Sequence, residues 1–111
     1  MSENIKNIAS EIYEELAKLF GGEIKSVILY GSYARGDFNL ESDVDIMILS
    51  GCEQNEITKR RKEISRIASR VGLKNDIMVS LLVRNCADYE RQMKYQPFYQ
   101  NIEKEGMKIY G

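Results

Sequence analysis

Histidine and tryptophan are absent from this chain of 111 residues, and it contains only one proline and two cysteines. Without histidine, neither a Ser-His-Asp nor a Cys-His nucleophile system can form. A zinc site is also disfavoured, because two widely separated cysteines are the only soft ligands. Any general base must therefore be a carboxylate, a lysine, a tyrosine or water.

An excess of positive charge and a long apolar run are also missing. The 16 basic and 17 acidic residues give a net charge of −1, so the chain lacks the basic surface of a tight nucleic-acid binder. No apolar run approaches the ~20 residues that span a bilayer, and the acidic, amphipathic N-terminus is unlike a signal peptide. Cys52 and Cys86 form no paired pattern, which favours reduced thiols. We therefore expect a single domain over residues 1–111 with a cytoplasmic location and no membrane partner.

Hydrophobic periodicity predicts alternating helices and strands along the chain. An apolar stripe with spacings of three and four predicts a first helix, which begins at Ser2 or Asn4 and ends at Gly21-Gly22. Strands are predicted over residues 26–30, 43–49 and 76–83, with an edge strand over 107–110. A helical turn is expected over 33–37 and a loop over 38–42. A helix is expected over 56–71, with Gly72 as its terminator, and further helical structure over 88–105, where a new helix begins at Pro97. The stripe of the first helix consists of Ile5, Ile8, Ile12, Leu16 and Leu19.

The connection between the first two strands constrains the topology. It contains about a dozen residues, which is short for a βαβ crossover, so antiparallel or mixed pairing is expected. Neither the G-x-G-x-x-G signature nor the Walker A lysine pattern is present. The sequence therefore predicts an α/β fold with a small mixed sheet flanked by helices.

The run GSYARGDFNLESDVDIMIL, residues 31–49, carries the most informative chemistry. Gly31-Ser32 follows the first strand as a turn that can hold phosphate oxygens. Asp43 and Asp45 project from one side of the second strand, ~6–7 Å apart. Two such carboxylates repel each other, and Mg²⁺ relieves the repulsion while taking waters and substrate phosphates as its other ligands. The pattern predicts magnesium-assisted handling of a nucleoside triphosphate.

The same run resembles the signature of the DNA polymerase β-like nucleotidyltransferases. Its GSYARG form, with the later NDIMVS at 75–80, resembles the minimal nucleotidyltransferase (MNT) group in particular. The motifs extend from about Val27 to Val79, and the order of elements suits the polymerase β-like fold. The resemblance implies metal-binding and catalytic roles for Asp43, Asp45 and Asp76, of which Asp76 would open the third strand and approach the attacking hydroxyl. It implies nucleotide-binding roles for Gly31, Ser32, Arg35 and Ser42.

Proteins of this kind move a nucleoside monophosphate from an NTP to a hydroxyl. MNT proteins are often encoded beside a HEPN-domain RNase toxin, which they neutralise by attaching AMP to a tyrosine. The resemblance thus implies a protein adenylyltransferase antitoxin that uses ATP and two Mg²⁺ ions, with a HEPN toxin as partner and a homo- or hetero-oligomeric state. A small-molecule, aminoglycoside-type nucleotidyltransferase that works with a partner is one alternative. A binding module that neutralises its partner by contact alone is another.

Several residues keep a second interpretation. Arg35 could contact phosphate or form a salt bridge with Asp37 or Glu41, and Asp76 could be a turn residue beside Asn75. The basic run 59–62 is interpreted as a solvated helix face rather than an RNA-binding patch. An aromatic group is interpreted as core and rim packing, with a partner-binding surface as the alternative; it consists of Tyr89, Tyr95, Phe98, Tyr99 and Tyr110.

Overall fold

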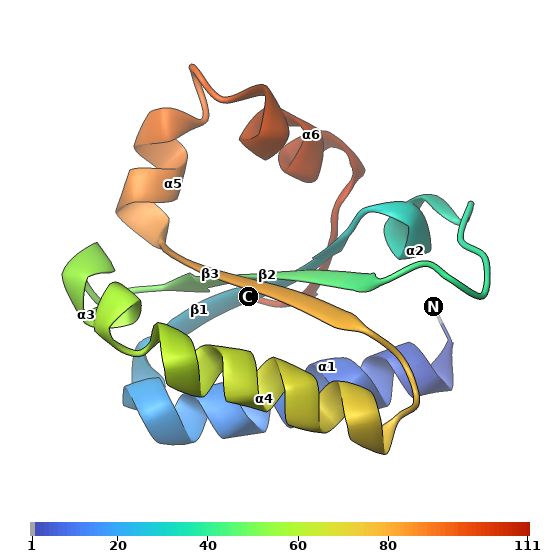
Figure 1. The fold of residues 1–111 in the computed structure, drawn as a ribbon. Coiled ribbons are helices and arrows are strands. Elements are labelled where there is room, and N and C mark those ends of the chain that lie inside the picture. The colour runs from blue at the N-terminus through green and yellow to red at the C-terminus, as the bar shows by residue number, and fades with distance from the viewer. Residues whose placement is uncertain (1) are drawn as a thin grey trace.

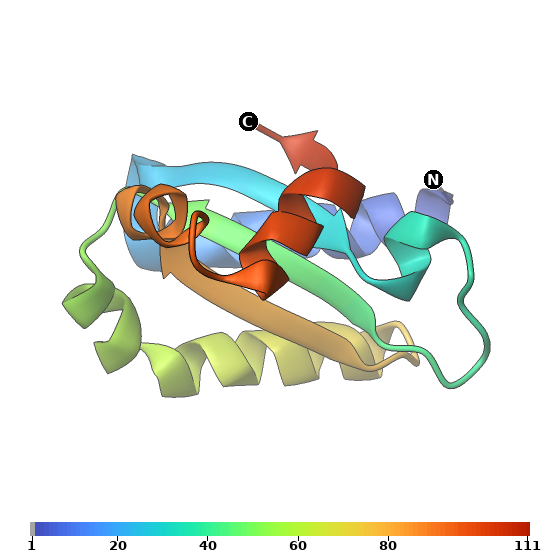
Figure 2. The ribbon, with the colours of Figure 1, turned by 90° about the horizontal axis from the view of Figure 1, so that it is seen from above.

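The computed structural model describes residues 2–111 and places a four-stranded sheet between two layers of helices (Figure 1). Helices α1 and α4 cover one face of the sheet, while α5 and α6 lie over the other (Figures 1 and 2). This confirms the predicted α/β fold with a small mixed sheet flanked by helices. The elements are α1 (Glu3–Phe20), a 3-10 turn (Gly21–Glu23), β1 (Ile24–Tyr30), α2 (Ser32–Arg35), β2 (Val44–Ser50), α3 (Gln54–Lys59), α4 (Arg61–Lys74), β3 (Val79–Asn85), α5 (Cys86–Gln92), α6 (Pro97–Glu105) and β4 (Met107–Tyr110).

The strand order is β3-β2-β1-β4, with β4 at an edge as predicted. The hairpin-like pair β1 and β2 is antiparallel, and its register places Tyr30 opposite Asp45. Strand β3 pairs with β2 in parallel, and its register places Ser80 beside Asp45. The short connection between β1 and β2 therefore gave the correct direction of pairing, and the helical connection between β2 and β3 supplies the parallel pair.

The first helix forms as its apolar stripe predicts. Ser2 is the N-cap residue, and its Oγ accepts a hydrogen bond from the Ile5 N–H at 3.3 Å. The inward positions of α1 are buried against β1, β2 and α4 in the larger of two hydrophobic clusters. Among residues 2–111, no helix is both long and apolar enough to cross a membrane.

Strand β2 is buried on both of its faces, and Val44, Ile46 and Ile48 belong to the larger hydrophobic cluster. Met47 is fully buried in a second cluster on the opposite face, beneath Tyr89 of α5 and Ile102 of α6. The apolar cover on this face ends near Asp45, which is half-buried. Helices α5 and α6 therefore determine how much of the carboxylate-bearing face stays open.

The helix predicted over residues 56–71 is in fact two helices. Helix α3 ends at Lys59, Arg60 has φ −101° and ψ 13°, and α4 continues from there to Lys74. Gly72 lies inside α4 and does not terminate it. The basic run 59–62 is largely exposed, as expected of a solvated face. Lys59 forms an ion pair with Glu56, and Arg60 forms one with Glu63.

The C-terminal third follows the prediction closely. Helix α5 is followed by a break, and α6 begins with Pro97 in its first turn, where the missing N–H costs nothing. Cys52 and Cys86 are both free thiols, as their spacing indicated. Within the aromatic group, Tyr89 is buried in the core as interpreted, while Tyr95 is exposed, and a partner-binding role stays untested.

Gly72→Ala is expected to lower the free energy of unfolding by about 1–3 kcal/mol, although alanine is the better helix former. A Cβ at position 72 would lie 2.6 Å from the carbonyl oxygen of Ile77, a backbone atom of the chain segment that follows α4. Urea denaturation measures the change, with Ser65→Ala on the exposed face of α4 as the control. Equal stability of the two variants would show that the turn after α4 moves aside without cost.

Candidate active site

The Gly31-Ser32 turn is tight because of the backbone conformation of its glycine. Strand β1 ends at Tyr30, and Gly31 has φ 74° and ψ −156°, a region that residues with a side chain rarely adopt. The Gly31 carbonyl oxygen accepts hydrogen bonds from the N–H groups of Ala34 and Arg35, at 3.1 and 3.0 Å. The chain therefore reverses directly from β1 into α2, and the turn stands at the open end of the sheet.

Asp45 lies directly against this turn. A Cβ at Gly31 would overlap the Asp45 Oδ2 atom and would lie 3.1 Å from Asp45 Cγ. The contact follows from the antiparallel register, which aligns Asp45 with Tyr30, the residue before the glycine. The structure thus brings together the two parts of the motif, the glycine turn and the second aspartate of the pair.

A cleft of about 350 Å³ opens over this contact. It contains four of the residues predicted from the sequence, Gly31, Ser32, Arg35 and Asp45. Its opposite wall is a face of α6 that the sequence reasoning did not assign to the site. Only a regular spacing of three and four residues along residues 98–105 could have signalled a common face. The residues that line the cleft are Tyr30, Gly31, Ser32, Arg35, Asp45, Phe98, Asn101, Ile102 and Glu105.

The Asp45 carboxyl is harder to ionise than a free carboxyl. Burial raises the pKa of the Asp45 carboxyl, the nearby Asp43 carboxylate raises it further, and the Arg35 guanidinium partly offsets both effects. Asp43 itself is exposed, one residue before β2 begins. Because a divalent cation relieves this repulsion, the pair has the donor chemistry that Mg²⁺ takes in proteins.

Tyr30 forms the floor of the cleft beside Asp45. Burial raises the pKa of its hydroxyl to about 12, and the negative charge of Asp45 adds to that shift. The phenol therefore keeps its proton at neutral pH and is available as a hydrogen-bond donor to a ligand in the cleft.

Arg35 forms one of the salt bridges that the sequence left open, and its contact with phosphate stays a prediction. Its Nε donates to Asp37 Oδ2 at 3.1 Å, which is one of the two predicted salt bridges. Its Nη1 donates to Glu105 Oε2 at 3.4 Å, so that α2 is tied to the C-terminal end of α6 across 70 positions of sequence. The guanidinium also lines the cleft, where it can reach an anionic ligand.

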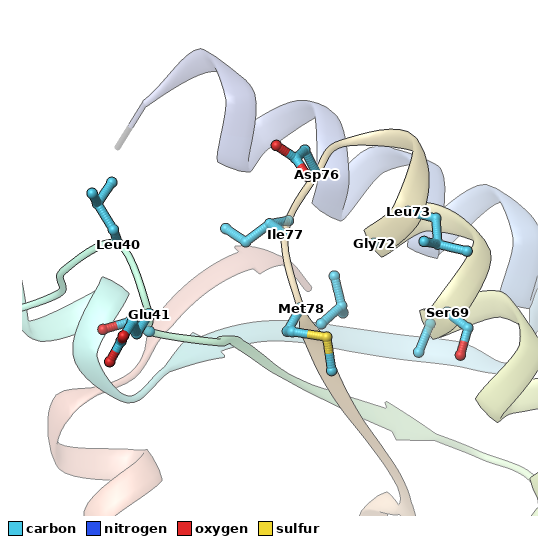
Figure 3. A pocket seen from close by; sticks show the side chains of 11 residues that line it. Leu40, Glu41, Ser69, Gly72, Leu73, Asp76, Ile77 and Met78 are labelled. Carbon is cyan, nitrogen blue, oxygen red and sulfur yellow. The ribbon is translucent and has the colours of Figure 1, made fainter.

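Asp76 and Ser42 do not lie in this cleft. They line a separate groove of about 530 Å³ between α4 and the loop before β2 (Figure 3). Strand β3 begins at Val79, and Asp76 occupies the preceding turn in a left-handed conformation, with φ 54°. Ser42 Oγ accepts a hydrogen bond from the Asn39 N–H at 2.9 Å and so holds the loop itself.

The prediction that Asp76 opens the third strand is therefore wrong, because the strand begins only at Val79. The role of Asp76 as a metal ligand and catalytic carboxylate stays a prediction. The parallel register places Ser80, and not an acidic residue, beside Asp45 on β3. Within residues 2–111, no three acidic or other metal-ligating side chains converge. The motif supplies the Asp45 carboxylate inside the cleft and the exposed Asp43 carboxylate two residues before it.

Comparisons with known proteins agree with this geometry. The family described as nucleotidyltransferase domain matches residues 9–109 of the chain. A Methanocaldococcus jannaschii protein named as a candidate protein adenylyltransferase is 34% identical over 105 residues, which are 95% of this chain and 98% of that protein.

Solved structures show the same fold. A crystal structure of a Sulfolobus solfataricus protein described as a candidate nucleotidyltransferase matches with a TM-score of 0.61 and 25% identity, over 94% of this chain and 78% of that one. A structure of a tri-AMPylated Shewanella oneidensis HEPN toxin in complex with an MNT antitoxin matches with a TM-score of 0.55 and 16% identity, over 96% of this chain and 72% of the matched chain.

Proposed function

This chain belongs to the nucleotidyltransferase domain family, and from that membership we propose that it transfers AMP from ATP to a hydroxyl group of a partner protein. The observation that carries the proposal is the contact of the Gly31-Ser32 turn with Asp45 inside one cleft. The cleft thereby presents a phosphate-holding turn and the Asp45 carboxylate to the same ligand, with Asp43 two residues before Asp45 in the chain.

Each cleft residue has a distinct role in this proposal. The N–H groups and hydroxyl of Gly31-Ser32 hold the triphosphate, and Arg35 adds a positive charge at the same end of the cleft. Asp43 and Asp45 would hold Mg²⁺, which neutralises phosphate charge and lowers the pKa of the attacking hydroxyl. Tyr30 remains protonated and donates a hydrogen bond beside Asp45. Positioning and electrostatic stabilisation then supply most of the rate enhancement.

The reaction is an in-line displacement at the α-phosphorus. The acceptor oxygen forms a bond to this atom while the bond between the α-phosphorus and the bridging oxygen of the β-phosphate breaks. Pyrophosphate leaves, and the proton of the hydroxyl passes to water. Since Asp76 lies in another groove, no carboxylate of β3 is needed as the base in this scheme.

The proposed acceptor is a tyrosine of a HEPN-domain toxin, so that the chain acts as the antitoxin of such a pair. Two likenesses support this choice, the name of the Methanocaldococcus jannaschii relative and the fold shared with the Shewanella oneidensis antitoxin complex. A domain of 111 residues with a small cleft also suits an acceptor that brings its own binding surface.

Incubation with α-labelled ATP and Mg²⁺ tests the proposal, with and without the product of the adjacent reading frame. We expect the label on a tyrosine of that product, as one or more AMP groups detected by mass spectrometry. An unmodified but inhibited partner would indicate neutralisation by contact alone, and label on an aminoglycoside rather than on protein would indicate a small-molecule enzyme. Either result would refute the proposal.

Asp76→Asn is expected to change the rate of AMP transfer by less than about three-fold. The side chain lines a groove outside the cleft, and asparagine tolerates the left-handed backbone conformation of this position. Initial rates at saturating ATP and Mg²⁺ provide the measurement. A loss of about a hundred-fold, typical of a missing catalytic base, would restore Asp76 to the catalytic set.

A further inference from the structure

We propose that the face of α6 that lines the cleft binds the base of the donor nucleotide, with Phe98 stacking on the base and Asn101 favouring adenine over guanine. The inference rests on the proposed nucleotide transfer and adds residues about fifty positions beyond the motif. The turn and the aspartates act on phosphates, which are the same in every NTP. Selection of ATP therefore requires other groups in the cleft.

Helix geometry directs the relevant side chains to one wall. Phe98, Asn101 and Glu105 are spaced by three and four residues, so they share a face of α6, and all three line the cleft. Ile102 lies between them and is buried against the sheet in the second hydrophobic cluster. Figure 2 shows α6 crossing over the sheet toward α2, so this face is fixed relative to the Gly31-Ser32 turn.

The two ends of this wall differ in chemistry as the two ends of a nucleotide do. At one end, Glu105 pairs with Arg35 at 3.4 Å, next to the turn that holds the phosphates. Phe98 lies two helical turns away, at roughly 10 Å along the helix axis. This end of the wall is uncharged. A nucleotide with its triphosphate at Arg35 would therefore place its flat base near Phe98.

The ring of Phe98 is suited to stacking. It remains 46% exposed, and its other contacts hold it in place. The ring packs on the edge of Tyr30 at 5.7 Å between centroids, with an interplanar angle of 83°. A base stacked on such a ring contributes to binding whichever base it is, because every base has a π-face.

Asn101 can distinguish the bases. It is exposed, and its carboxamide makes no hydrogen bond with any of the side chains or backbone groups of residues 2–111. The carboxamide offers one donor group and one acceptor, which match the N6 amino group and N7 of adenine. Guanine presents two acceptors at the same edge, so the match is lost.

Calorimetric binding of ATP, GTP and inorganic triphosphate, each with Mg²⁺ and without acceptor, tests the inference. The unaltered chain should prefer ATP to GTP by about ten-fold. Phe98→Leu should weaken ATP and GTP equally, by about ten-fold, and leave triphosphate binding unchanged. Asn101→Asp should lower the ATP-to-GTP ratio by about ten-fold, because a carboxylate accepts from the N1 and N2 hydrogens of guanine. The negative charge added by Asn101→Asp weakens the binding of both nucleotides alike, so it does not change the ratio of their affinities.

Tyr95→Leu and Lys104→Ala are the matched controls, an exposed aromatic before α6 and a position of α6 outside the cleft. Both should bind all three ligands as the unaltered chain does. The inference would be overturned if Phe98→Leu bound ATP as tightly as the unaltered chain and Asn101→Asp kept the ATP-to-GTP affinity ratio. It would also be overturned if Phe98→Leu lost affinity for inorganic triphosphate as much as for ATP. Failure of the unaltered chain to bind any of the three ligands would instead contradict the proposed function.

Discussion

Asp45→Asn is expected to lower AMP transfer by about a thousand-fold while the chain stays folded. The substitution keeps the size of the side chain against Gly31 but removes the one carboxylate of the motif that lines the cleft. A neutral amide is a poorer Mg²⁺ ligand than a carboxylate, and it no longer balances the positive charge of the metal ion. Steady-state transfer of labelled AMP measures the loss, with Asp76→Asn as the same chemical change outside the cleft.

The same variant is expected to be more stable than the unaltered chain in metal-free solution. Burial and the Asp43 carboxylate raise the pKa of Asp45 above its usual value of 3.8, so the ionised group destabilises the folded state. This destabilisation is fully present at neutral pH and disappears as the pH falls below both the folded and the unfolded pKa. Because the side chain is only partly buried, solvent screening keeps the gain below about 1 kcal/mol.

Urea denaturation at pH 7 and at pH 4, in the presence of a chelator, separates these two effects. We expect the advantage of Asp45→Asn at pH 7 to shrink at pH 4, where Asp45 begins to take up a proton in the unaltered chain. A variant that loses transfer because it is unfolded would contradict the assignment. So would a variant that retains a tenth or more of the transfer rate.

The sequence predicted the elements that its local chemistry defines. The apolar stripe and Ser2 cap determine α1, and the short connection after Tyr30 determines the antiparallel pair of β1 and β2. The boundary between α3 and α4 has no such marker. No glycine or proline lies near Arg60. Ile57 and Ile64 are seven residues apart and would face the core from one continuous helix as well, so the apolar pattern does not mark the break.

The candidate site was predicted where its residues are close in sequence and missed where they are not. Gly31 and Asp45 are joined by a short hairpin-like connection, and the structure places them in contact. Asp76 was misplaced because the apolar alternation of β3 extends back through Ile77, although the strand begins only at Val79. The wall formed by α6 depends on packing against the far side of the sheet, which no local pattern reveals.

Gly31→Ala is expected to lower transfer by about a hundred-fold and the free energy of unfolding by about 1–3 kcal/mol. Two separate penalties act at this position. The backbone has φ 74° and ψ −156°, a region essentially restricted to glycine, and the added methyl group would overlap the Asp45 carboxylate. Relief of either one requires that the turn or the carboxylate move, and both movements separate the groups that the proposed reaction needs together.

Gly36→Ala separates the two penalties. Gly36 also has a positive φ, 86°, but with ψ 7° it lies in the left-handed helical region, and a Cβ there would meet no atom within 4 Å. This variant should lose about 1–2 kcal/mol of stability and keep its transfer rate, since the carboxylate is undisturbed. If both variants lose transfer equally, the left-handed strain alone is responsible, and the contact of Gly31 with Asp45 has no special place in the site. If only Gly31→Ala does, the close approach of turn and carboxylate is what makes this end of the sheet a nucleotide site.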